Sequence, residues 1–214
     1  MAVGRRTSIS KFFVFVHTPG IKMDISKLTS ALIELDKLKS VTRRSYVSSG
    51  LRRENSAEHS WHTAIAVWLL CEAGEQSVDQ LKLLKMAIVH DIGEIDHGDT
   101  SVYAADQSRK YDQEAACMDR ICLFYPELLD EFQKLWLEYE QQNTPESKLL
   151  KVADRLLPLL HNMESEGKSW KEQDISRSQV LEINQPVREL IPPLYRWIEA
   201  QVDLAVSKGW LTDT

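Results

Sequence analysis

The sequence predicts an all-α fold, a single helical bundle of about six or seven helices. Three observations point to this class. Glycine and proline are scarce among the 214 residues, with 8 and 7 copies, although an all-β fold needs turn residues at short intervals. Apolar residues recur at helical spacing along most of the chain. No repeat, Gly/Ser run or Pro-rich stretch divides it, so we expect an N-terminal extension, residues 1–22, followed by one helical domain, residues 23–214.

The first predicted helices have recognisable starts. Asp24 or Ser26 can cap a helix that ends near Leu38. The segment 40–55, polar and rich in Arg and Ser, is expected to be a loop with essentially no strand structure. Ser56 begins the next helix and can cap it; its run from Trp61 through Leu70 is apolar almost all round, which indicates burial on most sides.

Further helices are predicted where cap residues precede apolar stripes. Thr144 and Pro145 form a clear helix start, because Thr can cap and Pro is favoured at the first helical position. Pro158 is expected to bend that helix, and Pro192–Pro193 to interrupt the last one. In chain order these helices begin at Ser77 or Asp79, Asp106, Pro126, Thr144 and Ser178, and the last ends near Ser207.

Composition excludes several classes of function. The formal charge of −6 argues against a nucleic-acid groove as the main surface. A local basic cluster, Arg43–Arg44 with Arg52–Arg53, fits a small anionic substrate or a solvated loop equally well. The three cysteines have no metal-type spacing and are expected to be buried free thiols of a reducing compartment. No stretch approaches the roughly 20 apolar residues of a membrane span, so the expected location is the cytoplasm, without membrane contact.

Four residues of metal-ligating type are spread over three predicted helices: His59, the adjacent His90 and Asp91, and Asp154. Two imidazoles and two carboxylates suit a divalent ion such as Mn, Co, Fe, Ni, Zn or Mg. Adjacent helical residues point in different directions, so His90 and Asp91 can both reach one ion only near a helix end. Gly93 is expected to provide that end.

Asp154 is the strongest single candidate among them. Its neighbours along the helix are apolar, and a buried carboxylate is costly unless it is paired or binds a metal. A pair with Lys151 or Arg155 is the alternative. His59 alone is more typical of an ordinary, partly buried histidine, so the metal hypothesis depends on all four residues together.

The ordered set His59, His90–Asp91 and Asp154 resembles the signature of the HD superfamily of metal-dependent phosphohydrolases. The phrases from Arg53 to Ser60, from His90 to Glu94, and Gly98–Asp99 are similar to the 5′-deoxynucleotidase-like subgroup. The resemblance implies one divalent ion bound by the four residues. It also implies a water activated by that ion, which attacks a nucleoside 5′-monophosphate.

The same resemblance implies roles for residues around the ion. Glu94 and Asp99 match the two acids expected near the attacking water and the substrate. The phosphate-binding arginine is Arg43 or Arg44. Independently of the resemblance, Lys151 is a further candidate for that contact because it lies one helical turn before Asp154, although a solvated lysine is the alternative. Residues considered for sugar or base contact are Tyr46 and Thr100.

Other functions fit parts of this pattern. The same metal site could hydrolyse a nucleoside triphosphate or a signalling nucleotide, and a degenerate family member could bind metal or nucleotide without turnover. The expected partner is a small phosphorylated substrate. A homodimer is also implied, and the apolar face of the last helices could serve either self-packing or dimerisation, through Leu190, Ile191, Leu194, Trp197 and Ile198.

Overall fold

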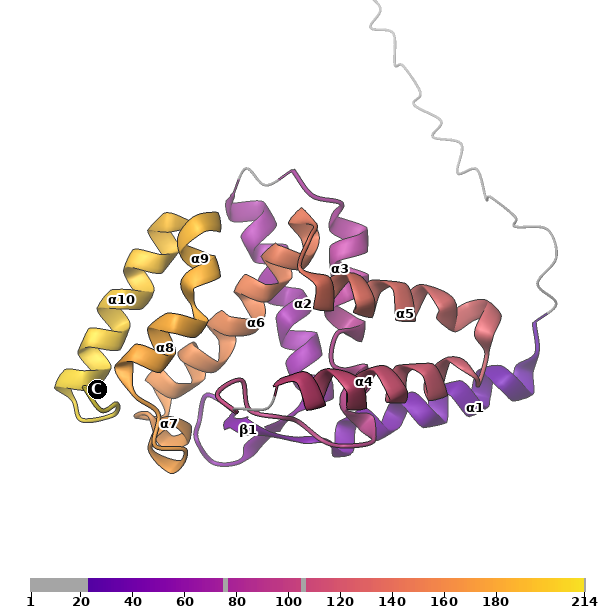
Figure 1. Cartoon of the computed structure of the whole chain (residues 1–214), viewed down its shortest axis with the longest axis horizontal. Helices are drawn as coiled ribbons and strands as arrows, with labels where there is room; N and C mark the ends of the chain where they lie inside the picture. Colours follow the sequence, from indigo (N-terminus) through magenta and orange to yellow (C-terminus); the bar gives the residue numbers. More distant parts are fainter. Residues whose placement is uncertain (1–22, 75–76, 105–106, 214) are drawn as a thin grey trace, which may run out of the picture.

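The computed structural model describes residues 23–74, 77–104 and 107–213. Within these residues it contains ten α-helices and one two-stranded sheet, which confirms the all-α class. The predicted extension, residues 1–22, lies outside the described residues. In Figure 1, α2, α3 and α6 occupy the middle of the molecule, with α1, α4 and α5 at one end and α7 to α10 at the other.

The helices differ from the predicted set in number rather than in position. They are α1 (Ile25–Asp36), α2 (Ser56–Ala73), α3 (Gln80–Val89), α4 (Gln107–Cys122), α5 (Pro126–Gln141), α6 (Pro145–Glu164), α7 (Lys168–Glu172), α8 (Arg177–Ile183), α9 (Gln185–Leu190) and α10 (Pro192–Ser207). Two short 3₁₀ helices, η1 (Lys37–Ser40) and η2 (Ile92–Ile95), join them.

The excess over six or seven helices arises in the last part of the chain. Helix α7 is additional, between the helices predicted to begin at Thr144 and Ser178, and the predicted last helix is divided into α8, α9 and α10. Pro186 and Pro192 lie in the first turns of α9 and α10, where proline starts a helix but cannot continue the preceding one. The predicted caps Asp24, Asp79 and Thr144 are confirmed, since each side chain accepts a hydrogen bond from its helix.

The segment 40–55 is not a loop, which corrects the sequence prediction. It forms an antiparallel hairpin of β1 (Thr42–Tyr46) and β2 (Arg53–Asn55), with Thr42 opposite Asn55. The usual alternation of apolar residues is missing, because the buried side chains of the hairpin are polar. Ser45 and Glu54 are both buried, and the Ser45 hydroxyl donates to Glu54 Oε2 at 3.0 Å.

Helix α2 is less buried than its sequence suggests. It packs against α3 and α6, yet Trp61, Trp68 and Leu69 are 65%, 53% and 63% exposed. The expectation of burial on most sides is therefore wrong, because the neighbouring helices cover only part of its circumference. None of the described helices is long and apolar enough to cross a membrane.

Two hydrophobic clusters stabilise the helices. One lies mainly among α1 to α5, and the other joins α6 to α7–α10. Leu70, Leu190 and Ile191 pack against both clusters. The apolar face of the last helices is largely used inside the chain, since Ile198 is fully buried, whereas Trp197 is 40% exposed.

Candidate metal centre

The structure brings together the four residues of metal-ligating type. His59 lies in the first turn of α2, His90 caps the end of α3, Asp91 follows it, and Asp154 lies within α6. His59 Nε2 lies 3.2 Å from Asp154 Oδ1 and 3.9 Å from Asp91 Oδ2. His90 Nε2 lies 3.2 Å from Asp91 Oδ1. Donor atoms of His59, His90 and Asp91 lie within 4.8 Å of one another, so these residues could hold one metal ion.

A helix end allows His90 and Asp91 to face the same point. Helix α3 ends at Val89, His90 is its C-cap, and Asp91 is the N-cap of η2. Gly93 has a different role from the one expected, because it does not adopt a left-handed conformation. A Cβ at Gly93 would lie 2.8 Å from the Cβ of Glu114, so glycine allows η2 to approach α4 closely.

The start of α2 fixes His59. Asn55 caps the helix and forms a capping box with Glu58, so Ser56 is the first helical residue rather than the cap. The Ser56 hydroxyl instead donates to Glu94 Oε2 at 2.6 Å. The helix that presents His59 is thereby joined directly to the candidate catalytic acid.

His90 presents a nitrogen lone pair in the form that a metal needs. His90 Nδ1–H donates to the Ala87 carbonyl at 2.8 Å, which leaves Nε2 unprotonated and directed into the cluster. Among the described residues, His90 Nε2 has no hydrogen-bond partner although it is buried. Burial lowers the pKa of His90, so its ring is neutral near pH 7. This orphaned nitrogen fits a metal ligand.

His59 is surrounded by carboxylates on both sides of its ring. Nδ1 lies 3.3 Å from Glu54 Oε2, and Nε2 faces Asp154. Burial and Arg43 oppose protonation of His59, but hydrogen bonds to Asp154 and Glu54 dominate and raise its pKa to about 9. In the absence of a metal, a proton on this ring partly balances the acids.

Asp154 has more partners than the sequence suggested. Tyr139, from α5, donates its hydroxyl hydrogen to Oδ2 at 2.7 Å. Lys151 Nζ lies 3.7 Å from Oδ2 and donates to the Tyr139 hydroxyl at 2.8 Å. Although burial opposes ionisation, the His59 hydrogen bond and the charges of Lys151 and Arg155 hold the pKa of Asp154 well below its usual range. The carboxylate is therefore ionised and available to a cation.

Arg43 and Arg44, adjacent on β1, occupy different environments. Arg43 Nη1 lies 2.7 Å from Asp91 Oδ2, 3.8 Å from Glu94 Oε1 and 3.7 Å from Asp99 Oδ1. The Arg44 side chain is exposed, and its backbone N–H donates to Asp99 Oδ2 at 2.9 Å. Only Arg43 places its guanidinium among the acids.

Glu94 is the acid whose protonation is most perturbed. It is 1% exposed, and burial together with the charge of Asp91 raises its pKa well above the usual range, against the opposing effect of Arg43. A carboxyl group of this kind can hold a proton at neutral pH and exchange it with a reacting group.

A pocket of about 210 Å³ opens beside the cluster. The candidate site residues that line it are Arg43, Arg44, His90, Asp91, Glu94, Asp99, Thr100, Lys151 and Asp154. Other residues that line it include Tyr103, Trp170, Val180, Ile183 and Asn184. Tyr46 does not line this pocket; its hydroxyl donates to Glu172 at 2.7 Å, and its ring contacts Arg53 and Lys168.

Sequence reasoning missed two residues that orient the cluster. Glu54 faces His59, and its only sequence signal is its place in the phrase that precedes the first histidine. Tyr139 supports Asp154 from another helix, and nothing in its local sequence distinguishes it from a core tyrosine.

Comparisons with known proteins agree with this geometry. Residues 35–194 match a family model described as HD domain. The 5′-deoxynucleotidase hdd1 of Schizosaccharomyces pombe is 27% identical over 84% of each chain. The 5′-deoxynucleotidase HDDC2 of Danio rerio is 31% identical over 64% of this chain and 70% of its own. A crystal structure described as a predicted metal-dependent phosphohydrolase from Magnetospirillum magnetotacticum is 36% identical, with a TM-score of 0.80 over 86% of this chain and 94% of that one.

Proposed function

Because the chain belongs to the HD-domain family, we propose that it is a metal-dependent phosphomonoesterase that removes phosphate from (deoxy)nucleoside 5′-monophosphates. The observation that supports this most is the convergence of two histidines and two aspartates, three of which line a pocket. Relatives named 5′-deoxynucleotidase support the same substrate class.

One divalent ion would be held by His59, His90, Asp91 and Asp154. The unpartnered Nε2 of His90 and the ionised Asp154 fit such an ion, and Mn, Co, Fe, Ni, Zn and Mg are the candidates. When bound, the ion would activate a water and neutralise charge on the phosphoryl group.

The chain's own acids and cations would then position the reactants. Glu94, buried and bonded to Ser56, would take or hold the proton of the attacking water. The Asp99 carboxylate accepts a hydrogen bond from the backbone N–H of Arg44 and lies near the Arg43 guanidinium. In this position it would contact the substrate together with Arg43. Which of the two acids moves the proton is decided by comparing the pH profiles of Glu94→Gln and Asp99→Asn.

The residues that line the pocket suggest how a nucleotide would be bound. Arg43 would contact the phosphate beside the metal ligands, and Arg44 and Lys151 line the same pocket. The apolar lining residues, which include Val180 and Ile183, suit a nucleoside. Thr100 also lines the pocket and is the remaining candidate for sugar contact.

Phosphate release from a panel of 5′- and 3′-nucleoside monophosphates tests the proposal. Metal-stripped protein would be assayed with each ion restored, beside His90→Ala, Glu94→Gln and the exposed control His97→Ala. We expect release that requires metal, favours 5′-phosphates and is lost in the first two variants only. No release with any ion would refute the monophosphatase, whereas hydrolysis of triphosphates alone would favour the alternative substrate class.

Cytoplasmic location and a homodimer stay predictions. The exposed Trp61, Trp68 and Leu69 of α2 provide apolar surface that a second copy could cover. Light scattering on the purified protein would test the dimer, and a variant with Trp61→Glu and Leu69→Glu should be monomeric if this surface forms it.

A further inference from the structure

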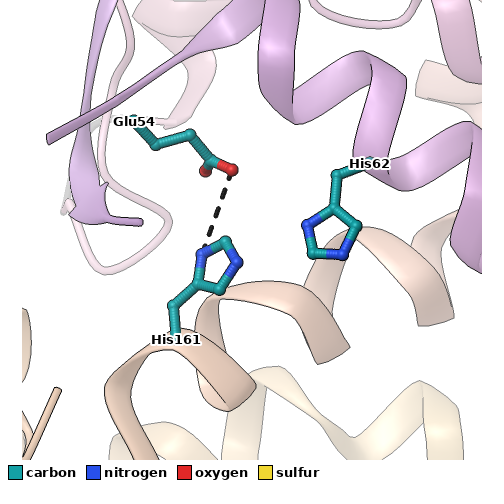
Figure 2. Close-up of side chains that lie close together, drawn as sticks. All are labelled: Glu54, His62 and His161. Carbon is teal, nitrogen blue, oxygen red and sulfur yellow. Dashed lines mark ion pairs between the residues drawn. The ribbon is translucent and has the colours of Figure 1, made fainter. Parts of the chain in front are cut away.

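A second group of potential ligands lies outside the pocket. Glu54 comes from β2, His62 from α2 and His161 from α6, and Figure 2 shows the three side chains directed toward one another. Each offers one ligand atom, and these atoms lie within 4.8 Å of one another. None of the three lines the pocket beside His90.

The periodicity of the α-helix explains why these three side chains lie together. His62 follows His59 by three residues, and His161 follows Asp154 by seven. Residues at these spacings lie on nearly the same face of a helix. The two helices that supply His59 and Asp154 therefore supply a second pair of side chains one or two turns further along.

The contacts within the group leave one ring nitrogen of His161 without a hydrogen-bond partner among the described residues. His161 is 5% exposed and Glu54 is 2% exposed. Glu54 Oε1 lies 3.9 Å from His161 Nδ1, which is too long for a hydrogen bond. In the part of the chain that the structure describes, His161 Nδ1 has no hydrogen-bond partner. Buried polar atoms are usually paired, so this one needs an explanation.

A simple ion pair does not explain the arrangement. Burial lowers the pKa of His161, so the ring is neutral near pH 7 and has no charge to pair with Glu54. The ring of His62 stacks on that of His161, with centroids 5.4 Å apart and planes inclined by 23°. Two adjacent imidazoles beside a carboxylate are instead the usual ligands of a borderline divalent ion.

We propose that Glu54, His62 and His161 form a second cation site, separate from the centre at His90 and selective for ions of the Zn²⁺ class over Mg²⁺. Zinc binds imidazole and carboxylate at about 2.0–2.2 Å, so the ligand atoms need to move together by less than about 1 Å. His62 is half-buried and can make most of this adjustment. Three protein ligands leave a fourth position for water.

Glu54 connects this site to the first one. Its Oε2 accepts from the Ser45 hydroxyl and lies 3.3 Å from His59 Nδ1, whereas its Oε1 faces His161. An ion bound through Oε1 would hold the carboxylate that orients His59. Partners of this kind typically change metal affinity by about 10- to 100-fold when removed.

Zinc content of the intact protein tests the proposal. Metal-stripped protein would be loaded with Zn²⁺, freed of unbound ions and analysed for zinc per chain, with circular dichroism to verify folding. We expect two ions in the wild type and in the exposed control His97→Gln. We expect one ion in His62→Gln, in His161→Gln and in His90→Ala, and none in the variant that combines His90→Ala with His161→Gln.

Co²⁺ titration provides a second readout. Visible absorption should saturate in two steps in the wild type and in one step in His161→Gln. A wild type with one ion, or a His161→Gln variant that keeps two, would overturn the second site and leave a water-bridged pair as the explanation. Such a failure would not affect the proposed phosphatase, which depends on His90 and on metal-dependent phosphate release.

Discussion

Replacement of Arg43 by methionine should strongly destabilise the metal-free protein. The guanidinium is the cation at the centre of the acids: it lies 2.7 Å from Asp91 and within 4 Å of Glu54, Glu94 and Asp99. Burial opposes its charge, but these carboxylates raise the pKa of Arg43 well above the usual value. Methionine replaces the aliphatic stem of arginine but has no charge, so the change leaves buried carboxylates without their partner.

The expected size follows from this environment. Removing one partner of a buried ion pair typically costs about 3–5 kcal/mol. In a chain of this length, each kcal/mol lowers the melting temperature by roughly 2–4 °C, so the variant should melt roughly 6–20 °C below the wild type. Arg44→Met is the matched control, because that side chain is exposed and should contribute at most about 0.5 kcal/mol.

Thermal unfolding followed by circular dichroism measures the effect, first without metal and then with saturating Zn²⁺ or Mn²⁺. A divalent ion neutralises the same carboxylates, so it should reduce the deficit of Arg43→Met by at least half. Equal melting temperatures for the two arginine variants would refute the electrostatic argument. A deficit that metal leaves unchanged would show that the loss comes from packing instead.

Three further predictions concern residues around the site. Gly93→Ala should cost about 1–3 kcal/mol in urea unfolding, because its Cβ would lie 2.8 Å from that of Glu114; an unchanged midpoint would contradict this close approach. Tyr139→Phe should weaken Zn²⁺ binding by about 10- to 100-fold in chelator competition, since Asp154 loses a donor; an unchanged affinity would exclude this role. Burial raises the pKa of Glu114 from 4.5 to about 7, so the folded state binds the proton more tightly and loses stability, by at most about 3 kcal/mol, as pH rises between these values. Urea unfolding from about pH 5 to about pH 8 should show this slope reduced in Glu114→Gln, and an equal slope would assign it to other groups.

The site could be predicted from the sequence where ligand types and helix geometry coincide. His90 and Asp91 are adjacent, so they needed a helix end, and α3 ends at Val89. Asp154 lies among apolar neighbours, which pointed to a bound or paired carboxylate before any contact was known. Helix starts such as the one at Thr144 could also be predicted, because an N-cap requires only one polar side chain at one position of the sequence.

Other features depend on contacts between distant segments, which local patterns do not contain. The hairpin was missed because its buried residues, Ser45 and Glu54, satisfy each other through a polar contact and show no apolar alternation. The exposure of Trp61 depends on which sides of α2 its neighbours cover. Gly93 was predicted to end a helix, whereas its absent side chain makes room for Glu114, about twenty positions away in the sequence.

Strand β2 leads directly into helix α2, and this connection fixes the spacing between Glu54 and His59 along the chain. Strand β2 ends at Asn55, and the same residue caps the helix that begins at Ser56, so no linker separates Glu54 from His59. The carboxylate and the imidazole therefore belong to one rigid corner, and their separation along the chain cannot vary. A single inserted residue after Ser56 would rotate His59 by about 100° around the helix axis and turn it away from Asp154. Natural variation in this family should accordingly alter residue types within the corner and leave its length constant.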